Sequence, residues 1–449
     1  MYTLLFKNFF RTRSAYLGLI FLLLSGVVSL YIGKQFLDKQ ESNVLHTAQY
    51  QQEHIQRYVK YFDKESGLLL YYLKFGLVNK TDNLNGLSIG QRDLNPSVQS
   101  LTIRNLEGQK YDTDLNNPVS LLFGNLDLGF VIIFLFPLVI ISFCYNILSE
   151  EKEDSTWTLL SVQSQKPVSI LFKKLEIRFV AVAGVLFVLI FLAVIMLELP
   201  LNVALLGFVL VSLLYLVFWF ALSFWIVSWN KNSSISAASL LSFWIILILI
   251  LPALLNNYIL NKYPLPEALD TVIEQREGYH EKWDTDKKAT LEKFYKHYPQ
   301  FESFGYPKES FTWLWYYAMQ QMGDDESKAQ SDLLHQKLWK REKMSRNFSY
   351  FVPGLHTQLQ FNELTRSGLS NQLKFIEKTG EFHEKNRLYF YPEIFGNEPV
   401  SSINWDSFKL EYYHENDSFN WFSMLVPLII FCLLLGFLSI TNFRKPLLS

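Results

Sequence analysis

Apolar residues along the chain gather in six long stretches, separated by segments that are rich in charged side chains. A bilayer core of about 30 Å needs roughly 20 apolar residues in a helix, because every backbone polar group must be satisfied within the segment. Each stretch has about this length and contains no charged residue. The pattern therefore predicts six transmembrane helices, at residues 15–33, 128–148, 179–197, 201–227, 235–255 and 421–441.

Lysine and arginine residues are found in the short segments that fall on one side of these six helices. Short loops with such residues stay in the cytoplasm, whereas long loops cross the membrane largely regardless of charge. We therefore predict that both termini are cytoplasmic, and that the second and third spans are joined inside the cell. The predicted cytoplasmic segments are 1–14, 149–178 and 442–449, and the predicted extracytoplasmic insertions are 34–127 and 256–420.

The two predicted insertions read as mostly helical. Apolar residues recur at three-to-four-residue intervals from Leu37 to Phe62, which predicts that the first helix continues beyond the membrane. Residues 101–111, with Glu107-Gly108 at the centre, predict a small β-hairpin. The predicted fold class is thus an all-α membrane protein with minor β structure. In the second insertion we predict amphipathic helices at 267–297, 311–322, 327–346 and 354–379.

The composition agrees with a chain that is partly dissolved in lipid, since 50% of the residues are hydrophobic and 18% are charged. The two cysteines, Cys144 and Cys432, fall inside apolar stretches, so they give the polar segments no disulfide framework. This favours a bacterial inner (plasma) membrane over an animal cell surface. The net charge of -1 hides a strong segregation of charged residues, so no acidic or basic partner can be read from it; we predict no nucleic-acid partner.

Motifs for chemistry are absent from the sequence. It contains no G-x-x-x-x-G-K-[ST], H-E-x-x-H or C-x-x-C, so we predict no ATP, metal or other cofactor in this chain and no enzymatic activity. The charge-free spans also argue against an ion channel or a proton-coupled carrier, which leaves an energy source outside the chain. Histidines in the second insertion could build a metal site, but scattered surface residues explain them better: His280, His297, His335, His356, His383 and His414.

The cytoplasmic loop after the second span combines acidic and apolar residues. Glu150 and Glu153 favour a helix N-terminus, and Trp157, Leu159 and Leu160 offer apolar contacts. A short helix with such residues indicates a docking element for the groove of a partner. A solvated connector with an interfacial tryptophan is the alternative. Residues 2–11 pose a similar choice between an amphipathic elbow helix at the interface and the positive flank of a signal-anchor.

Here the sequence also resembles a known family. Glu150-x-x-Glu153, Ser155-Thr156, Leu159-Leu160, Pro167-Val168-Ser169 and Lys174 are similar to the E-x-E-x-G-T-x-x-x-L-L…P-x-S…K pattern of ABC-2 type permeases. Asp154-Ser155 departs from this pattern, because the family usually has glycine before the threonine. The resemblance implies that the loop contains a coupling helix seated in a cleft of the ATP-binding subunit, through Glu150, Glu153, Thr156, Trp157, Leu159 and Leu160.

A segment of the second insertion resembles a subgroup of the same family. Residues 353–364, 368–370 and Phe375 are similar to an uncharacterised ABC permease domain, which is related to the permease of the nitrous-oxide-reductase maturation system. The resemblance implies separate ABC ATP-binding subunits that hold ATP and Mg, and a second permease copy or a paralogue in the same bilayer. The elbow helix at residues 1–14 would then lie beside the ATP-binding subunit.

The functional hypothesis is a permease subunit of an ABC-type exporter, or of a complex that transmits force to its outer domains without moving a solute. The charge-free spans fit both versions equally well. The alternative from another class is a membrane-anchored extracytoplasmic ligand-binding or sensor protein without an ATPase partner. A membrane enzyme ranks third, because the outer His, Asp and Glu residues show no recognisable spacing.

Overall fold

A computed structural model of the chain describes residues 2–110, 125–163, 167–284, 286–415 and 419–444. Within these residues, six helices are long and apolar enough to cross a membrane, as the sequence predicts. Four of them are the single helices α2 (Arg13–Tyr61), α10 (Pro167–Met196), α11 (Val203–Val227) and α19 (Trp421–Arg444). The second comprises α6 (Leu128–Phe130), the π turn η2 (Val131–Leu135) and α7 (Phe136–Cys144), and the fifth comprises α12 (Ser233–Ile245), the π turn η3 (Ile246–Ile250) and α13 (Leu251–Lys262).

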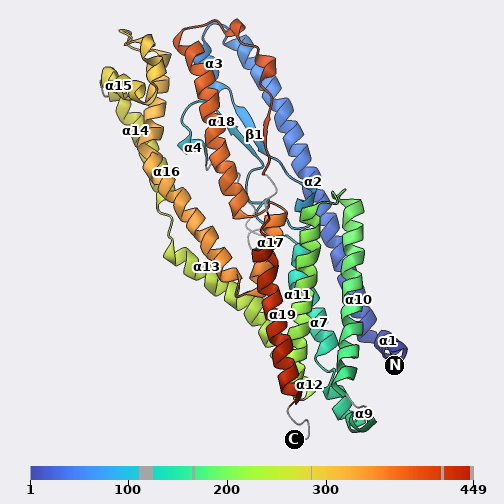
Figure 1. The fold of residues 1–449 in the computed structure, drawn as a ribbon. Helices are drawn as coiled ribbons and strands as arrows, with labels where there is room; N and C mark the ends of the chain where they lie inside the picture. Colours follow the sequence, from blue (N-terminus) through green and yellow to red (C-terminus); the bar gives the residue numbers. More distant parts are fainter. Residues whose placement is uncertain (1, 111–124, 164–166, 285, 416–418, 445–449) are drawn as a thin grey trace.

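The six helices form a bundle with α11 at its centre (Figure 1). In the most apolar part of α11, 61% of the residues are buried, whereas the fifth helix buries only 11%. Tyr215 and Trp219 of α11 are fully buried and belong to a core that also draws on α7, α10 and α19. The fifth helix therefore lies at the edge of the bundle and exposes most of its apolar surface.

Asparagine residues form the N-caps of two of the spans, α11 and α12. The Asn202 side chain accepts a hydrogen bond from the Leu205 backbone N–H at 3.0 Å, and the Asn232 side chain accepts one from the Ile235 N–H at the same distance. Such N-caps satisfy backbone donors that the first helical turn leaves without a partner. The turn between α10 and α11 is short, and Glu198 takes a left-handed conformation there, with φ of 52°.

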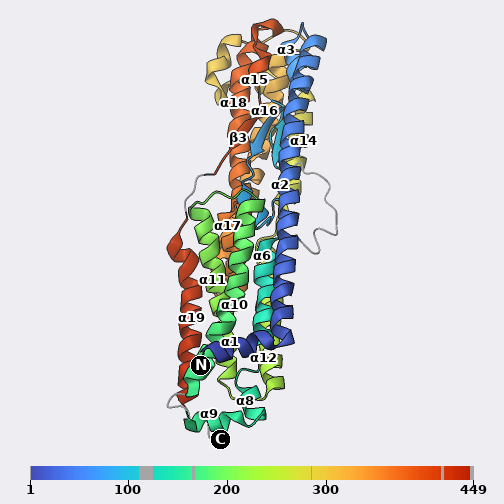
Figure 2. The same cartoon turned by 90° about the vertical axis from the view of Figure 1, so that its right-hand side faces the viewer.

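The helix α2 has 49 residues, so at 1.5 Å per residue it is about 74 Å long. It runs from the bundle into a second body, which we call the distal region: the upper part of α2 with the described residues of 62–110 and 263–415 (Figure 2). The predicted continuation of the first helix to Phe62 is thereby confirmed to within one residue. One continuous rod thus joins both bodies.

The distal region combines both of the predicted insertions. Its elements are α3 (Ser66–Tyr72), β1 (Phe75–Asn79), η1 (Asn83–Gly86), β2 (Val98–Leu101), α4 (Glu107–Lys110), α14 (Glu267–Asp284), α15 (Lys287–His297), η4 (Pro299–Phe304), α16 (Trp313–Ser349), α17 (Pro353–Leu364), α18 (Leu369–Phe395), η5 (Val400–Ser402), η6 (Trp405–Ser407) and β3 (Glu411–Tyr413). Leu69 and Phe75 from the first insertion share an apolar core with Phe294, Tyr317 and Phe390 from the second. The two insertions therefore fold as one body.

A small sheet makes the same connection. Among the described residues, β1 pairs antiparallel with β2, with Phe75 opposite Leu101, and parallel with β3, with Leu77 opposite Glu411. The β-hairpin predicted at 101–111 is wrong, because Leu101 ends β2 and Glu107 begins α4; position 111 lies outside the described residues. The Gln109 side chain instead accepts a bond from the Thr102 N–H at 2.9 Å, which a hairpin strand would need for its own partner.

Three of the helix boundaries predicted in this region are also wrong. The helices predicted at 311–322 and 327–346 are one helix, α16, since no proline or cap interrupts them. The helix predicted at 354–379 is two, α17 and α18, because Arg366 takes a left-handed conformation with φ of 54°. The helix predicted at 267–297 is also divided, and Asp286 caps the second part by accepting a bond from the Lys288 N–H at 3.1 Å.

Candidate functional site

The segment between the second and third spans folds as two short helices. They are α8 (Ser149–Glu153) and α9 (Thr156–Gln163), and α9 lies at the end of the molecule that also holds both termini (Figures 1 and 2). Ser155, between them, has a φ of 60°, a left-handed backbone conformation that residues other than glycine adopt rarely. The backbone therefore turns sharply here, and α9 leaves the axis of α8.

The two acidic residues predicted for the site, Glu150 and Glu153, accept hydrogen bonds from other residues of the chain. The Glu150 side chain is exposed and accepts a bond from the Asn146 amide at 3.0 Å. The Glu153 carboxylate accepts two bonds from Ser233, at the start of α12: one from its backbone N–H at 3.1 Å and one from its hydroxyl at 2.8 Å. Glu153 is thus a cap for the fifth span, a role that the sequence pattern did not suggest.

The remaining predicted site residues belong to α9. Trp157 is buried, with 8% of its surface exposed, and packs into the bundle core, so it anchors α9. The Thr156 hydroxyl donates to the Glu151 carbonyl at 3.0 Å. Leu159 and Leu160 lie in the same helix, but their side chains are outside the described part of the structure. Val162 is 81% exposed and gives α9 an apolar surface that faces away from the core.

Further contacts attach this pair of helices to the bundle. Glu151 of α8 forms an ion pair with Lys174 of α10, and the Ser149 and Ser233 hydroxyls are 2.7 Å apart. Sequence reasoning did not single out Glu151 or Ser233, because neither has a signal beyond its residue type. In the described residues, α8 is thus connected to α10 and α12, and Trp157 connects α9 to the bundle core.

The first helix, α1 (Tyr2–Arg11), crosses the same end of the bundle (Figure 2). Phe9 packs edge-on against Phe143 of α7, with ring centroids 5.2 Å apart, and the Tyr2 hydroxyl donates to Glu176 of α10 at 2.9 Å. Leu4 and Phe6 are 68% and 51% exposed. The helix therefore has one packed face and one exposed apolar face, as an amphipathic helix at a membrane surface has.

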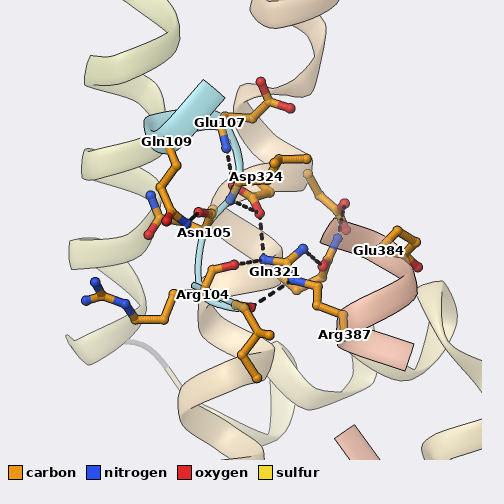
Figure 3. A network of polar contacts seen from close by, with 12 residues as sticks. Arg104, Asn105, Glu107, Gln109, Gln321, Asp324, Glu384 and Arg387 are labelled. Carbon is orange, nitrogen blue, oxygen red and sulfur yellow. Dashed lines mark hydrogen bonds and ion pairs between the residues drawn. The ribbon is translucent and has the colours of Figure 1, made fainter. Parts of the chain in front are cut away.

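The distal region contains a buried polar network, drawn in Figure 3. The Asp324 carboxylate of α16 accepts bonds from the backbone N–H groups of Leu106 and Glu107, at 2.8 and 3.1 Å, and pairs with Arg387 of α18 at 2.7 Å. Arg387, with 2% of its side chain exposed, also donates to the Ile103 carbonyl at 3.1 Å. The network joins two helices to residues 103–107, which lead from β2 into α4.

Burial shapes the charges in this network. It raises the pKa of Asp324 above its ordinary value, although Arg387 and the two backbone N–H groups act in the opposite direction. Burial alone would lower the pKa of Arg387, but Tyr391 and Asp324 outweigh it and raise that pKa, so the guanidinium stays charged. His383 lies beside Arg387, and burial and this positive charge hold its pKa well below the ordinary value. We interpret the network as structural, since its charged groups are paired and closed to solvent.

Within the part of the chain that the structure describes, no group of three or more His, Cys, Asp or Glu residues is placed to hold a metal ion. The predicted candidate histidines are spread over the distal region. His356 bonds to the Met424 carbonyl at 2.9 Å, and His297 pairs with Asp325 at 2.8 Å. These contacts give both side chains a structural role.

Comparison with known proteins gives one match. A family model described as a domain of unknown function (DUF3526) matches residues 269–410. The matched residues run from α14 to the segment after η6 and include Asp324, Arg387 and the segment 353–375, but not residues 103–107 of the polar network. No curated protein and no solved structure matches the chain.

Proposed function

We propose that the chain is the membrane-spanning permease subunit of an ABC-type exporter or mechanotransmission complex, driven by separate ATP-binding subunits. One observation carries the proposal: α8 and α9 lie at the end of the bundle, Glu151 and Glu153 connect α8 to α10 and α12, and Trp157 of α9 packs into the bundle core. A coupling element needs this combination, because it must present a surface to its motor and also pass motion to the spans.

The backbone at Ser155 supports the same proposal. ABC-2 type permeases, which the loop resembles, usually have glycine just before the threonine that corresponds to Thr156. Ser155 stands at that position and adopts a left-handed φ of 60°, the conformation that glycine adopts at least cost. Serine thus occupies a backbone conformation that the glycine of the family pattern would adopt at less cost.

In the proposed mechanism, the ATP-binding subunits hold ATP and Mg and seat α9 in a cleft on the cytoplasmic side. Closure of these subunits displaces α9, and the ion pair between Glu151 and Lys174 passes the displacement to α10. The bonds from Ser233 to Glu153 pass it to α12. Both termini then lie in the cytoplasm, and the distal region lies outside the cell. A second permease copy or a paralogue completes the complex.

The shape of α2 favours the mechanotransmission version. It is a single helix from Arg13 to Tyr61 and contains no proline, so it passes movement from the membrane to the distal region as one rigid rod. Gln51 and Gln52, in its upper part, both donate to the Phe408 carbonyl, at 3.1 and 2.6 Å. This contact binds the rod to the segment that leads into β3.

The test is co-purification of the intact complex from native membranes in a mild detergent. We expect a protein with a P-loop signature to co-purify with the chain, together with vanadate-sensitive ATPase activity. Replacing Val162 with aspartate puts a charge on the exposed apolar surface of α9 and should abolish both. The matched control is Leu201→Asp, since Leu201 is 85% exposed at the opposite end of the bundle. This variant should leave co-purification and ATPase activity unchanged.

Two results would reject the proposal. One is a stable, ligand-binding chain that purifies without any ATPase, as expected for a membrane-anchored sensor protein. The other is an ATPase that stays bound equally well in the Val162→Asp and Leu201→Asp variants. For the complex in proteoliposomes, ATP-dependent flux of a solute would favour export, whereas ATPase activity with movement of the distal region and no flux would favour force transmission.

A further inference from the structure

A cavity of about 250 Å³ lies where the end of the fifth span meets the distal region. It is enclosed by α13, by the last part of α16, by α17 and by the start of α18. Its polar lining includes two arginines and two glutamates, which are Arg341, Arg346, Glu342 and Glu363. Its apolar lining includes Ile259 and Leu260 of α13. None of these residues belongs to the site at α8 and α9.

The charges around the cavity are balanced but not all paired. Arg346 donates through Nη2 to Glu342 Oε1 at 3.0 Å and to Glu363 Oε2 at 2.5 Å, so each carboxylate uses one oxygen and keeps the other as an acceptor. Arg341 donates through Nε at 2.9 Å and through Nη2 at 2.5 Å to a main-chain carbonyl, that of Tyr263. No carboxylate in the described residues forms an ion pair with Arg341. The cavity therefore offers a cation and, separately, carboxylate oxygens.

The start of α18 adds further donors. Gly368, Leu369 and Ser370 line the cavity, and the N-terminus of this 27-residue helix has no side-chain cap. Backbone N–H groups at such an end are suited to a phosphate, because they carry the positive end of the helix dipole. Arg341 and the start of α18 both line the cavity, and each suits an anion.

The cavity reaches the last turns of the fifth span, whose apolar side chains are exposed along much of its length. Leu249, Leu254 and Tyr258 are 46%, 59% and 48% exposed, and Ile259 and Leu260 follow them at the cavity. A span of about 20 residues that begins near Ser233 reaches the bilayer surface close to Asn256, which also lines the cavity. The polar cavity is thus at headgroup depth, directly above an apolar surface that faces lipid.

We propose that this cavity binds the headgroup of a zwitterionic phospholipid that carries a phosphate and a primary ammonium, as phosphatidylethanolamine does. The phosphate pairs with Arg341 and the start of α18, the ammonium donates to Glu342 and Glu363, and the acyl chains lie along α12 and α13. A purely anionic headgroup would meet two carboxylates, and a quaternary ammonium has no N–H to donate to them. The proposal requires only that the fifth helix crosses a bilayer, and does not rest on the ATPase partner.

The experiment uses the full-length chain in phosphatidylcholine nanodiscs that contain a trace of a photoactivatable lipid. We expect a phosphatidylethanolamine probe to label peptides from α13 and residues 341–346 more strongly than a phosphatidylcholine probe with the same photoreactive group. Arg341→Gln should reduce this labelling roughly tenfold, the effect of losing one charge-assisted hydrogen bond. Arg341→Lys should restore part of it, and Lys343→Gln, an exposed residue on the same helix, should leave it unchanged.

A second variant protects the test against misfolding. Ser370→Phe fills the cavity and removes no charge, so it should also abolish the labelling. Soluble phosphoethanolamine is the competitor that separates a membrane lipid from a free headgroup. Equal labelling by both lipid probes, labelling that survives Arg341→Gln and Ser370→Phe, or complete competition by the soluble compound would each overturn the proposal.

Discussion

The hydroxyl of Tyr215 in α11 donates a hydrogen bond to the carbonyl oxygen of Ile133 in the π turn of the second span, at 3.0 Å. Pro137, four residues after Ile133, has no N–H and so cannot supply the donor that an α-helix aims at this carbonyl. Trp244 of α12 donates to the next carbonyl, that of Phe134, at 3.3 Å. Tyr215 thus satisfies the carbonyl that the proline leaves without its helical donor, and Trp244 adds a second bond between neighbouring spans.

Replacing Tyr215 with phenylalanine removes this donor and keeps the ring. The Ile133 carbonyl would then be buried without its partner, and we expect the free energy of unfolding to fall by about 1 kcal/mol. Denaturant unfolding of the purified chain in detergent measures the change. Tyr31→Phe is the control, because Tyr31 is 57% exposed on α2 and its loss should cost nothing. Equal stability of the two variants would contradict this role of Tyr215.

The contact shows where sequence reasoning succeeds and where it stops. A charge-free stretch of about 20 residues has one stable solution in a bilayer, so the six spans could be predicted from composition alone. Pro137 and Pro252 lie next to the π turns η2 and η3, and the sequence marks these positions as breaks. It does not show that Tyr215, about 80 residues away, supplies the missing donor, because a tyrosine in an apolar helix has many other roles.

The distal region gives the same lesson on a larger scale. Leu77 and Glu411 are register partners in one sheet, although they belong to different insertions. Local periodicity carries no information on such pairing, so the sequence predicts two insertions but not the strands that join them. Similarly, Asp324 and Arg387 are charged residues on amphipathic helices, where a solvated face is the ordinary interpretation. Their burial depends on backbone donors from residues 106–107, which no local pattern links to them.

At the candidate coupling site, the sequence singled out Glu153 as a site residue but did not indicate its contact with Ser233. We expect Glu153→Ala to loosen the first turn of α12, because the Ser233 N–H and hydroxyl lose their acceptor. Amide hydrogen exchange in that turn should speed up roughly tenfold, which corresponds to one lost hydrogen bond to a charged group. Asp154→Ala is the matched control, since its exposed side chain has no such contact among the described residues. Equal exchange rates in both variants would show that the contact between Glu153 and Ser233 does not stabilise this turn.

The buried pair of Asp324 and Arg387 allows a comparison with an exposed pair on the same helix. Arg387→Met leaves the Asp324 carboxylate uncompensated, and we expect a loss of roughly 3–5 kcal/mol in the stability of the distal region. Lys385→Met breaks a pair of similar length with Glu411, 2.7 Å, in which the two side chains are 66% and 44% exposed. Its loss should cost less than about 1 kcal/mol. Urea unfolding followed by tryptophan fluorescence distinguishes the two, and equal costs would show that Arg387 is not needed.

His383 makes the stability of the distal region depend on pH. Burial first, and then the positive charges of Arg387 and Lys110, hold its pKa well below the ordinary value of about 6.5. The unfolded chain therefore binds a proton at this residue as the pH falls below about 6.5, while the folded chain does not. The contribution of His383 to stability is fully present above this pH and decreases below it, by up to about 1.4 kcal/mol per pH unit for one histidine.

Replacing His383 with glutamine removes this titration. The unfolding free energy of the parent minus that of the variant should decrease as the pH is lowered from 7 to about 5. The reason is that proton binding to His383 stabilises the unfolded state of the parent only. Other groups, such as Asp324, cancel in the difference. A parallel pair of stability curves for His383→Gln and its parent would mean that His383 does not stay neutral in the folded protein.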